Sequence, residues 1–186
     1  GYIYSNTIPF DIPVSLFQSG FPFSTDFEIK SSPLVIDFDN DGVKEMIFGD
    51  KNGLVHVVNS DGSEWNNEVF PFDTGNEIWG SLASADIDLD GLDEIFYFQE
   101  NQLICENTNG VLCNGFPINS GNAKHILIAN ILDDEYPEFI LKDNYTLRII
   151  SHNGSTIIEE LTENSMMPII IPDWNDTFAG LVDGNK

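Results

Sequence analysis

The sequence predicts an all-β fold: a sector of a β-propeller built from four-stranded antiparallel blades, about three of them complete, with partial units at the ends. A nine-residue acidic loop recurs along the chain, flanked each time by short apolar segments rich in β-branched and aromatic residues. Repeat units of roughly 40 to 50 residues with four short strands and no helical period are typical of propeller blades. A β-sandwich is the alternative, but it does not explain equally spaced signals in three successive units.

The acidic loop is complete twice, at 37–45 and 86–94. Both copies place carboxylates at loop positions 1, 3, 5 and 9, glycine at position 6 for a sharp bend, and a backbone carbonyl at position 7. Calcium takes six to eight oxygen ligands, whereas magnesium needs a tighter octahedron and retains waters. We therefore expect one calcium ion in each of these two loops.

Two other interpretations of the loops are possible. An EF-hand would carry a bidentate Glu at position 12 and flanking helices, but Phe48 and Tyr97 stand there, followed and preceded by strand-like segments. An acidic surface turn that binds nothing is the second alternative. Two full copies in register favour the metal loop, and the flanking segments indicate that each loop joins two strands.

Each unit is predicted to run as strand, metal loop, strand, turn, strand, turn, strand. In the first unit the strands are expected at 33–36, 45–48, 54–59 and about 68–72. Asx-Gly turns at 61–62, 109–110 and 153–154 recur after the loops. Phe-Pro pairs at 21–22, 70–71 and 116–117 precede them. We divide the single segment 1–186 into repeats at about 21–69, 70–115 and 116–160, with a partial repeat at 161–186.

A third copy of the loop, at 130–138, is degenerate. It keeps oxygen-bearing side chains only at positions 1, 5 and 9, as Asn130, Asp134 and Glu138, and has Leu132 and Glu135 at positions 3 and 6. We expect its calcium affinity to be weak or absent. In the fourth unit the loop at 172–176 has lost the spacing, and no metal is assigned there.

The motif Asp-x-Asp-x-Asp-Gly-x-x-Glu followed by an apolar strand resembles the FG-GAP/VCBS-type repeat, the calcium-binding blade of integrin-α-like propellers and of many bacterial surface proteins. The resemblance covers residues 15–186, and Glu at position 9 is closer to the bacterial form. It implies calcium in the loop between the first two strands of a blade. The implied ligands are Asp37, Asp39, Asp41, the Val43 carbonyl and Glu45 in one loop, and Asp86, Asp88, Asp90, the Leu92 carbonyl and Glu94 in the other.

Propellers close a ring of typically four to eight blades, so about three blades predict a fragment of a longer protein or a chain that assembles with a partner. The chain begins at Gly1 without methionine, and 31 Asp and Glu against seven Lys and Arg give a net charge of −24. Such a surface repels nucleic acid and anionic membranes. No apolar segment is long enough for membrane insertion. Cys105 and Cys113 form either a disulfide or two buried thiols.

The composition does not indicate an enzyme. His56, His125 and His152 lie in different units and form no recognisable triad. Trp residues pack between blades more often than they bind ligands, and Trp79, which aligns with Lys30 rather than with another Trp, is the best candidate for a ligand contact. The predicted function is a non-enzymatic, calcium-stabilised scaffold, extracellular or at the cell surface, that binds a protein or glycan at a propeller face. The alternatives are a sector of a carbohydrate-active enzyme and a structural spacer in a surface assembly.

Overall fold

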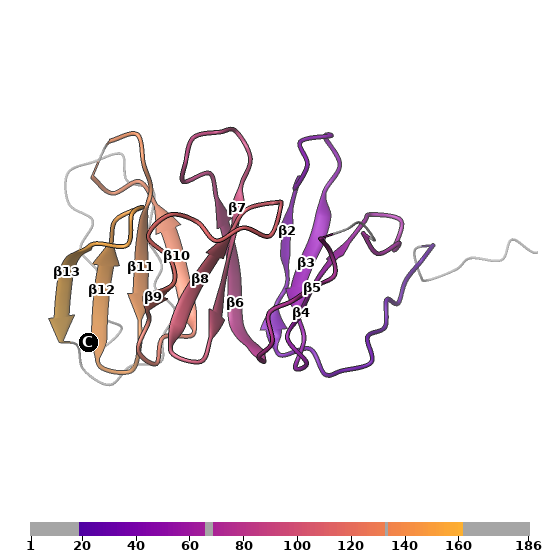
Figure 1. Cartoon of the computed structure of the whole chain (residues 1–186), viewed down its shortest axis with the longest axis horizontal. Helices are drawn as coiled ribbons and strands as arrows, with labels where there is room; N and C mark the ends of the chain where they lie inside the picture. Colours follow the sequence, from indigo (N-terminus) through magenta and orange to yellow (C-terminus); the bar gives the residue numbers. More distant parts are fainter. Residues whose placement is uncertain (1–18, 66–68, 133, 162–186) are drawn as a thin grey trace, which may run out of the picture.

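The computed structural model describes residues 19–65, 69–132 and 134–161, and every regular element in these ranges is a β-strand (Figure 1). The all-β prediction is confirmed for this part of the chain. No helix there is long and apolar enough to cross a membrane. The partial fourth repeat and its loop at 172–176 lie outside the described residues, as does Trp174.

The strands form three sheets, each built from four antiparallel strands that are neighbours in sequence, and the second sheet has a fifth strand at its edge. Sheet 1 contains β2 (Leu34–Ile36), β3 (Glu45–Gly49), β4 (Leu54–Val58) and β5 (Phe72–Asp73). Sheet 2 contains β6 (Ile78–Ala85), β7 (Glu94–Gln99), β8 (Gln102–Glu106) and β9 (Ile118–Asn119). Sheet 3 contains β10 (His125–Ala129), β11 (Glu138–Lys142), β12 (Thr146–Ile150) and β13 (Thr156–Leu161). A two-residue strand, β1 (Ser31–Ser32), pairs in parallel with β6.

The first three strands expected in the first unit are present, each within one residue of the expected ends. The fourth is shorter: β5 begins at Phe72, while the strand was expected from about residue 68. Residues 66–68 are outside the described ranges.

The three sheets lie side by side with their faces packed together (Figure 1). Successive residues of a strand point to opposite faces. On β7, Ile95 and Tyr97 enter the core shared with sheet 1, while Phe96 and Phe98 enter the core shared with sheet 3. Because both faces of β7 are buried, its sequence is a continuous apolar run rather than an alternating one. The described sheets form an open array and not a closed ring.

The Phe-Pro segments pack against the Asx-Gly turns. The backbone of Gly20 lies so close to the 61–62 turn that a Cβ on Gly20 would stand 1.9 Å from the Asp61 carbonyl oxygen. A Cβ on Gly115 would stand 2.4 Å from the Asn153 carbonyl oxygen at the third turn. The three Phe-Pro peptide bonds are cis. The spacing between these two recurrent signals therefore reflects a direct backbone contact in the first and third units. In the second unit the side chain of Val69 lies against the turn at Gly110.

A disulfide joins Cys105 at the end of β8 to Cys113 in the segment that follows, which decides between the two alternatives for these cysteines. The backbone N–H of Cys113 also donates to the Cys105 carbonyl at 3.0 Å. The equivalent contact in sheet 1 joins Trp65 to Val57 at 2.7 Å without a disulfide. Trp65 packs in the core, with its ring centroid 5.2 Å from that of Phe38.

Candidate metal centres

The aspartates at positions 1, 3 and 5 converge in both complete loops. The loops connect β2 to β3 and β6 to β7 at the same end of the array (Figure 1). In each triplet one oxygen per carboxylate lies within 4.8 Å of the other two. Calcium–oxygen distances of 2.3–2.6 Å place two ligands of one ion at most about 5 Å apart, so each triplet can share a single ion. The triplets are Asp37, Asp39 and Asp41, and Asp86, Asp88 and Asp90.

One carboxylate oxygen in the first loop supports a cation there. Asp37 Oδ2 accepts a hydrogen bond from the Gly42 N–H at 3.0 Å, but Asp37 Oδ1 is buried without a hydrogen-bond partner among the described residues. Burial of an unpaired carboxylate oxygen is costly. An oxygen-rich site with such an atom fits a hard divalent cation.

Backbone hydrogen bonds hold the loops in one shape. The N–H at position 7 donates to the carboxylate at position 5, from Val43 to Asp41 at 2.7 Å and from Leu92 to Asp90 at 2.8 Å. Position 4 has positive φ in both loops, 58° at Asn40 and 63° at Leu89. The following glycines, Gly42 and Gly91, have φ near 90°. Left-handed residues at positions 4 and 6, one on each side of the position-5 aspartate, fold the loop back so that its side-chain oxygens meet. The role of the Val43 and Leu92 carbonyls as ligands stays a prediction.

The glutamates at position 9 are not members of the aspartate clusters. Glu45 and Glu94 are buried, and their Oε2 atoms accept hydrogen bonds from the position-2 amides of Phe38 at 2.9 Å and Ile87 at 2.8 Å. In the degenerate loop, Glu138 Oε2 likewise accepts a hydrogen bond from the position-2 amide, that of Ile131, at 2.7 Å. The position-9 glutamate therefore links the start of the loop to the strand that follows it by a hydrogen bond. This contact is present in the two complete loops and also in the degenerate loop, which lacks the aspartate triplet.

Sequence reasoning assigned these glutamates to the metal alone and missed this contact. A signal was available, because Glu138 persists in a loop that has lost two other positions of the motif. Whether Glu45 and Glu94 also offer their second oxygen to a cation stays a prediction.

Burial changes the electrostatics of the glutamates. Burial is the main cause that raises the pKa of Glu94 to about 7; the negative charge of the loop aspartates acts in the same direction, and the hydrogen bond from Ile87 opposes the rise. Burial also raises the pKa of Glu45. The hydrogen bond from the Phe38 amide lowers this pKa, and the negative charge of the loop aspartates raises it. A bound cation would reverse the effect of the surrounding negative charge.

The degenerate loop is arranged differently. The Asn130 side-chain amide donates to the Asp134 backbone carbonyl, so Asn130 is engaged within the loop. Glu138 accepts a second backbone hydrogen bond, from Leu132 at 3.1 Å. Tyr136, at position 7, stacks on His152 with ring centroids 4.0 Å apart. The weak or absent calcium affinity of this loop stays a prediction.

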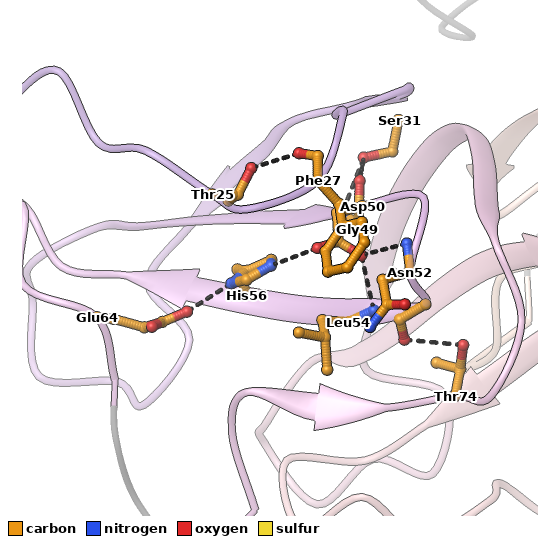
Figure 2. Close-up of polar contacts among 11 residues, drawn as sticks. Thr25, Phe27, Ser31, Gly49, Asp50, Asn52, Leu54, His56, Glu64 and Thr74 are labelled. Carbon is orange, nitrogen blue, oxygen red and sulfur yellow. Dashed lines mark hydrogen bonds and ion pairs between the residues drawn. The ribbon is translucent and has the colours of Figure 1, made fainter.

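A second polar cluster surrounds His56, for which the sequence indicated no partner (Figure 2). His56 Nδ1 lies 2.5 Å from Glu64 Oε1, and His56 Nε2 lies 3.2 Å from Asp50 Oδ2. Asp50 is buried, and its other oxygen accepts the amides of Asn52 at 2.8 Å and Leu54 at 3.0 Å. The cluster closes the β3–β4 hairpin, and its partners come from six and eight residues away, too far for a local motif to indicate.

Trp79, the candidate ligand contact, is 38% exposed. The Lys51 ammonium lies 5.7 Å from its ring centroid, within the range of a cation–π contact. Trp79 borders an open depression of about 430 Å³ together with Asn76, Glu77, Glu100 and Lys124.

Comparison with known proteins gives no family assignment. No family model matches the chain, and no curated protein matches it. Among solved structures, the V. cholerae biofilm matrix protein Bap1 aligns with a TM-score of 0.41 at 16% sequence identity. The alignment covers 73% of this chain and 28% of that one, so the chain spans less than a third of that protein's length. The FG-GAP/VCBS resemblance stays a prediction.

Proposed function

We propose that the chain is a calcium-stabilised extracellular β-propeller scaffold for adhesion or ligand recognition, without enzymatic activity. The observation that carries the proposal is the convergence of three aspartate carboxylates in each of two loops. The buried, unpartnered Oδ1 of Asp37 adds to it. Three carboxylates held this close repel one another, and a divalent cation offsets that repulsion.

In each loop the aspartates would hold the ion where β2 passes into β3 and where β6 passes into β7. The ion would supply two positive charges and fix the loop ends. Because the unfolded chain lacks such a site, cation binding and folding are coupled. With free calcium at about 100 times the dissociation constant, each site adds about 2.7 kcal/mol to the free energy of unfolding.

One observation supports an extracellular location, and another limits the partners. The Cys105–Cys113 disulfide is typical of oxidising compartments. The net charge of −24 becomes −20 after two calcium ions add four positive charges, which still disfavours nucleic acid and anionic membranes as partners.

Further repeats or neighbouring domains are the proposed packing partners of the array. β7 is buried on both faces by its neighbours, whereas β13 exposes Ile157, Ile158 and Leu161 at 39%, 43% and 86%. A further sheet would cover such residues, as expected if the sheets continue around a propeller axis.

Thermal unfolding with calcium and with a chelator tests the calcium proposal. We expect calcium to raise the melting temperature of the wild-type chain, and magnesium to raise it less. The double variant Asp39→Asn/Asp88→Asn should lose the response. The control Asp26→Asn/Glu77→Gln removes the same charge from exposed positions outside the loops and should keep it. A melting temperature that the chelator leaves unchanged, or an equal response in both variants, would contradict the proposal.

A crystal structure with calcium tests the architecture. Sheets arranged around a common axis would support the propeller. Sheets stacked as parallel layers would overturn it and leave the calcium loops intact.

A further inference from the structure

A cleft of about 350 Å³ lies between sheets 2 and 3, beside the second metal loop. One wall comes from the second loop and from the segment after β8, and the other from the degenerate loop and the turn after β12. The volume lies in the range of small-molecule sites. The cleft is lined by Ile87, Asp88, Glu94, Asn107, Leu112, Cys113, Asn114, Tyr136, His152 and Asn153.

The sheet 3 wall is aromatic. Tyr136 and His152 stack with centroids 4.0 Å apart and an interplanar angle of 21°, and both are partly exposed. At the same loop position the two complete loops have Val43 and Leu92, so the platform belongs to this cleft alone among the three loops. The negative face of an aromatic ring attracts weakly positive C–H groups, such as those on one face of a pyranose ring.

Two asparagines at the cleft offer oriented donors. Asn107 Oδ1 accepts the backbone amides of Asn109 and Val111, both at 3.0 Å. Asn153 Oδ1 accepts the Ser155 amide at 3.1 Å and the Ser151 hydroxyl at 2.7 Å. With their oxygens engaged in the turns, their NH₂ groups are left as donors, and neither NH₂ group has a hydrogen-bond partner among the described residues.

Apart from Asn114, the remaining polar side chains of the lining are acidic. Asp88 is exposed and belongs to the second aspartate triplet, while Glu94 is buried. None of the ten lining residues is Lys or Arg. A carboxylate at the cleft accepts hydrogen bonds from hydroxyl groups but repels anions.

We propose that this cleft binds a neutral saccharide. The C–H face of the sugar packs on the Tyr136 and His152 platform, the Asn107 and Asn153 amides donate to its oxygens, and Asp88 accepts from its hydroxyls. Acidic sugars are disfavoured, because the lining has no cationic side chain to pair with a sugar carboxylate. The inference rests on the proposed recognition function and specifies the ligand class and the site.

The test is an NMR titration of the ¹⁵N-labelled chain with the methyl glycosides of glucose, galactose and mannose, each to ~50 mM, enough to fill a site of millimolar affinity. At least one glycoside should shift the side-chain NH₂ signals of Asn107 and Asn153, and glucuronate should not. Shifts with glucuronate alone, shifts scattered over the surface, or no shift with any of the three glycosides would overturn the proposal.

Variants separate the platform from general folding effects. Tyr136→Ala should weaken binding by about tenfold or more, equivalent to ~1.4 kcal/mol, while Tyr136→Phe keeps the ring and should bind as the wild type does. Tyr145→Ala, at a tyrosine that is 57% exposed in the β11–β12 turn, is the matched control and should bind normally. Unweakened binding by a folded Tyr136→Ala variant would refute the platform.

Failure of this inference is distinguishable from failure of the calcium proposal. Glycoside-induced shifts report on the cleft, and the melting temperature with and without chelator reports on the metal loops. A calcium response without glycoside binding overturns the cleft alone, and glycoside binding without a calcium response supports it while contradicting the metal sites.

Discussion

The side-chain amide of Asn40 in the first metal loop donates a hydrogen bond to the backbone carbonyl of Gly91 in the second, at 2.6 Å and across 51 residues of sequence. The two loops are therefore held against each other as well as within their own sheets. The equivalent position in the second loop is Leu89, which is 46% exposed and has the same left-handed backbone. Position 4 of the loop thus makes a contact between sheets in the first copy, through Asn40. In the second copy it holds Leu89, a residue type that is unfavourable in a left-handed conformation.

Asn40→Gly should lower the free energy of unfolding by about 1 kcal/mol, because it removes the hydrogen bond to Gly91 while glycine still accepts the positive φ. Urea denaturation in calcium measures the loss. Leu89→Gly, at the same position of the other loop, is the control and should not destabilise the chain. Equal destabilisation by both variants would show that the Asn40 contact contributes nothing.

Leu89→Asn should stabilise the chain. A left-handed conformation costs a β-carbon-bearing residue about 1–2 kcal/mol, and asparagine tolerates it better than leucine does. Since Leu89 is exposed, little packing is lost. We expect the free energy of unfolding to rise by about 1 kcal/mol, seen as a higher urea midpoint at unchanged slope. A lower midpoint would mean that the Leu89 side chain has a packing role.

Glu138→Ala should destabilise the chain by about 2–4 kcal/mol, because it leaves the amides of Ile131 and Leu132 without their acceptor at a buried site. Glu138→Gln keeps an acceptor oxygen and should cost less. Denaturation curves of the two variants give the comparison. Added calcium should not restore the free energy of unfolding of the alanine variant, because the lost contact is to the backbone. If calcium restored it fully, Glu138 would be assigned to metal binding instead.

Stability should depend on pH through Glu106. Burial raises its pKa from 4.5 to about 7, while a hydrogen bond from the Tyr97 hydroxyl opposes the rise. Between these two values the folded chain keeps a proton that the unfolded chain releases. The contribution of Glu106 to stability is therefore complete below about pH 4.5 and is lost as the pH rises through 7.

Glu106→Gln should remove this loss, since the amide is neutral throughout and still accepts from Tyr97. Because one pKa unit corresponds to about 1.4 kcal/mol, the variant should gain on the order of 3 kcal/mol relative to the wild type between pH 4.5 and 8. The measurement is the difference between the two proteins' free energies of unfolding across that range. A pH-independent difference would rule out Glu106 as the titrating group.

The convergence of the aspartates was predictable because all three members of a triplet fall within five successive residues. Alternation and the glycine at position 6 then suffice to bring their carboxylates together. The strand positions were predictable for a similar reason, since apolar runs and Asx-Gly turns are local signals. β5 shows the limit: its single ladder with β4 covers only Leu54–Asp73 and Val55–Phe72, and its extent depends on the neighbouring strand.

The contacts of individual polar side chains were not predictable in this way. His56 had no apparent partner until folding brought Asp50 and Glu64 to its two ring nitrogens. Glu45 matched a ligand position in the motif, yet its burial directs one oxygen to the Phe38 amide. Spacing indicates that a carboxylate is near a loop, but not which donor its oxygens meet.

The sequence by itself determined the strand order, the hairpin turns and the two aspartate triplets, because these depend on residues a few positions apart. Only the tertiary structure decided how the loops touch through Asn40 and Gly91, and how the cleft beside Tyr136 and His152 is lined. It also decided that Cys105 and Cys113 are bonded. The loop contact and the cleft join groups from different sheets, and their positions follow from the packing of one sheet face on the next. The disulfide lies within one hairpin, where the spacing of the cysteines is compatible with either a bond or two thiols.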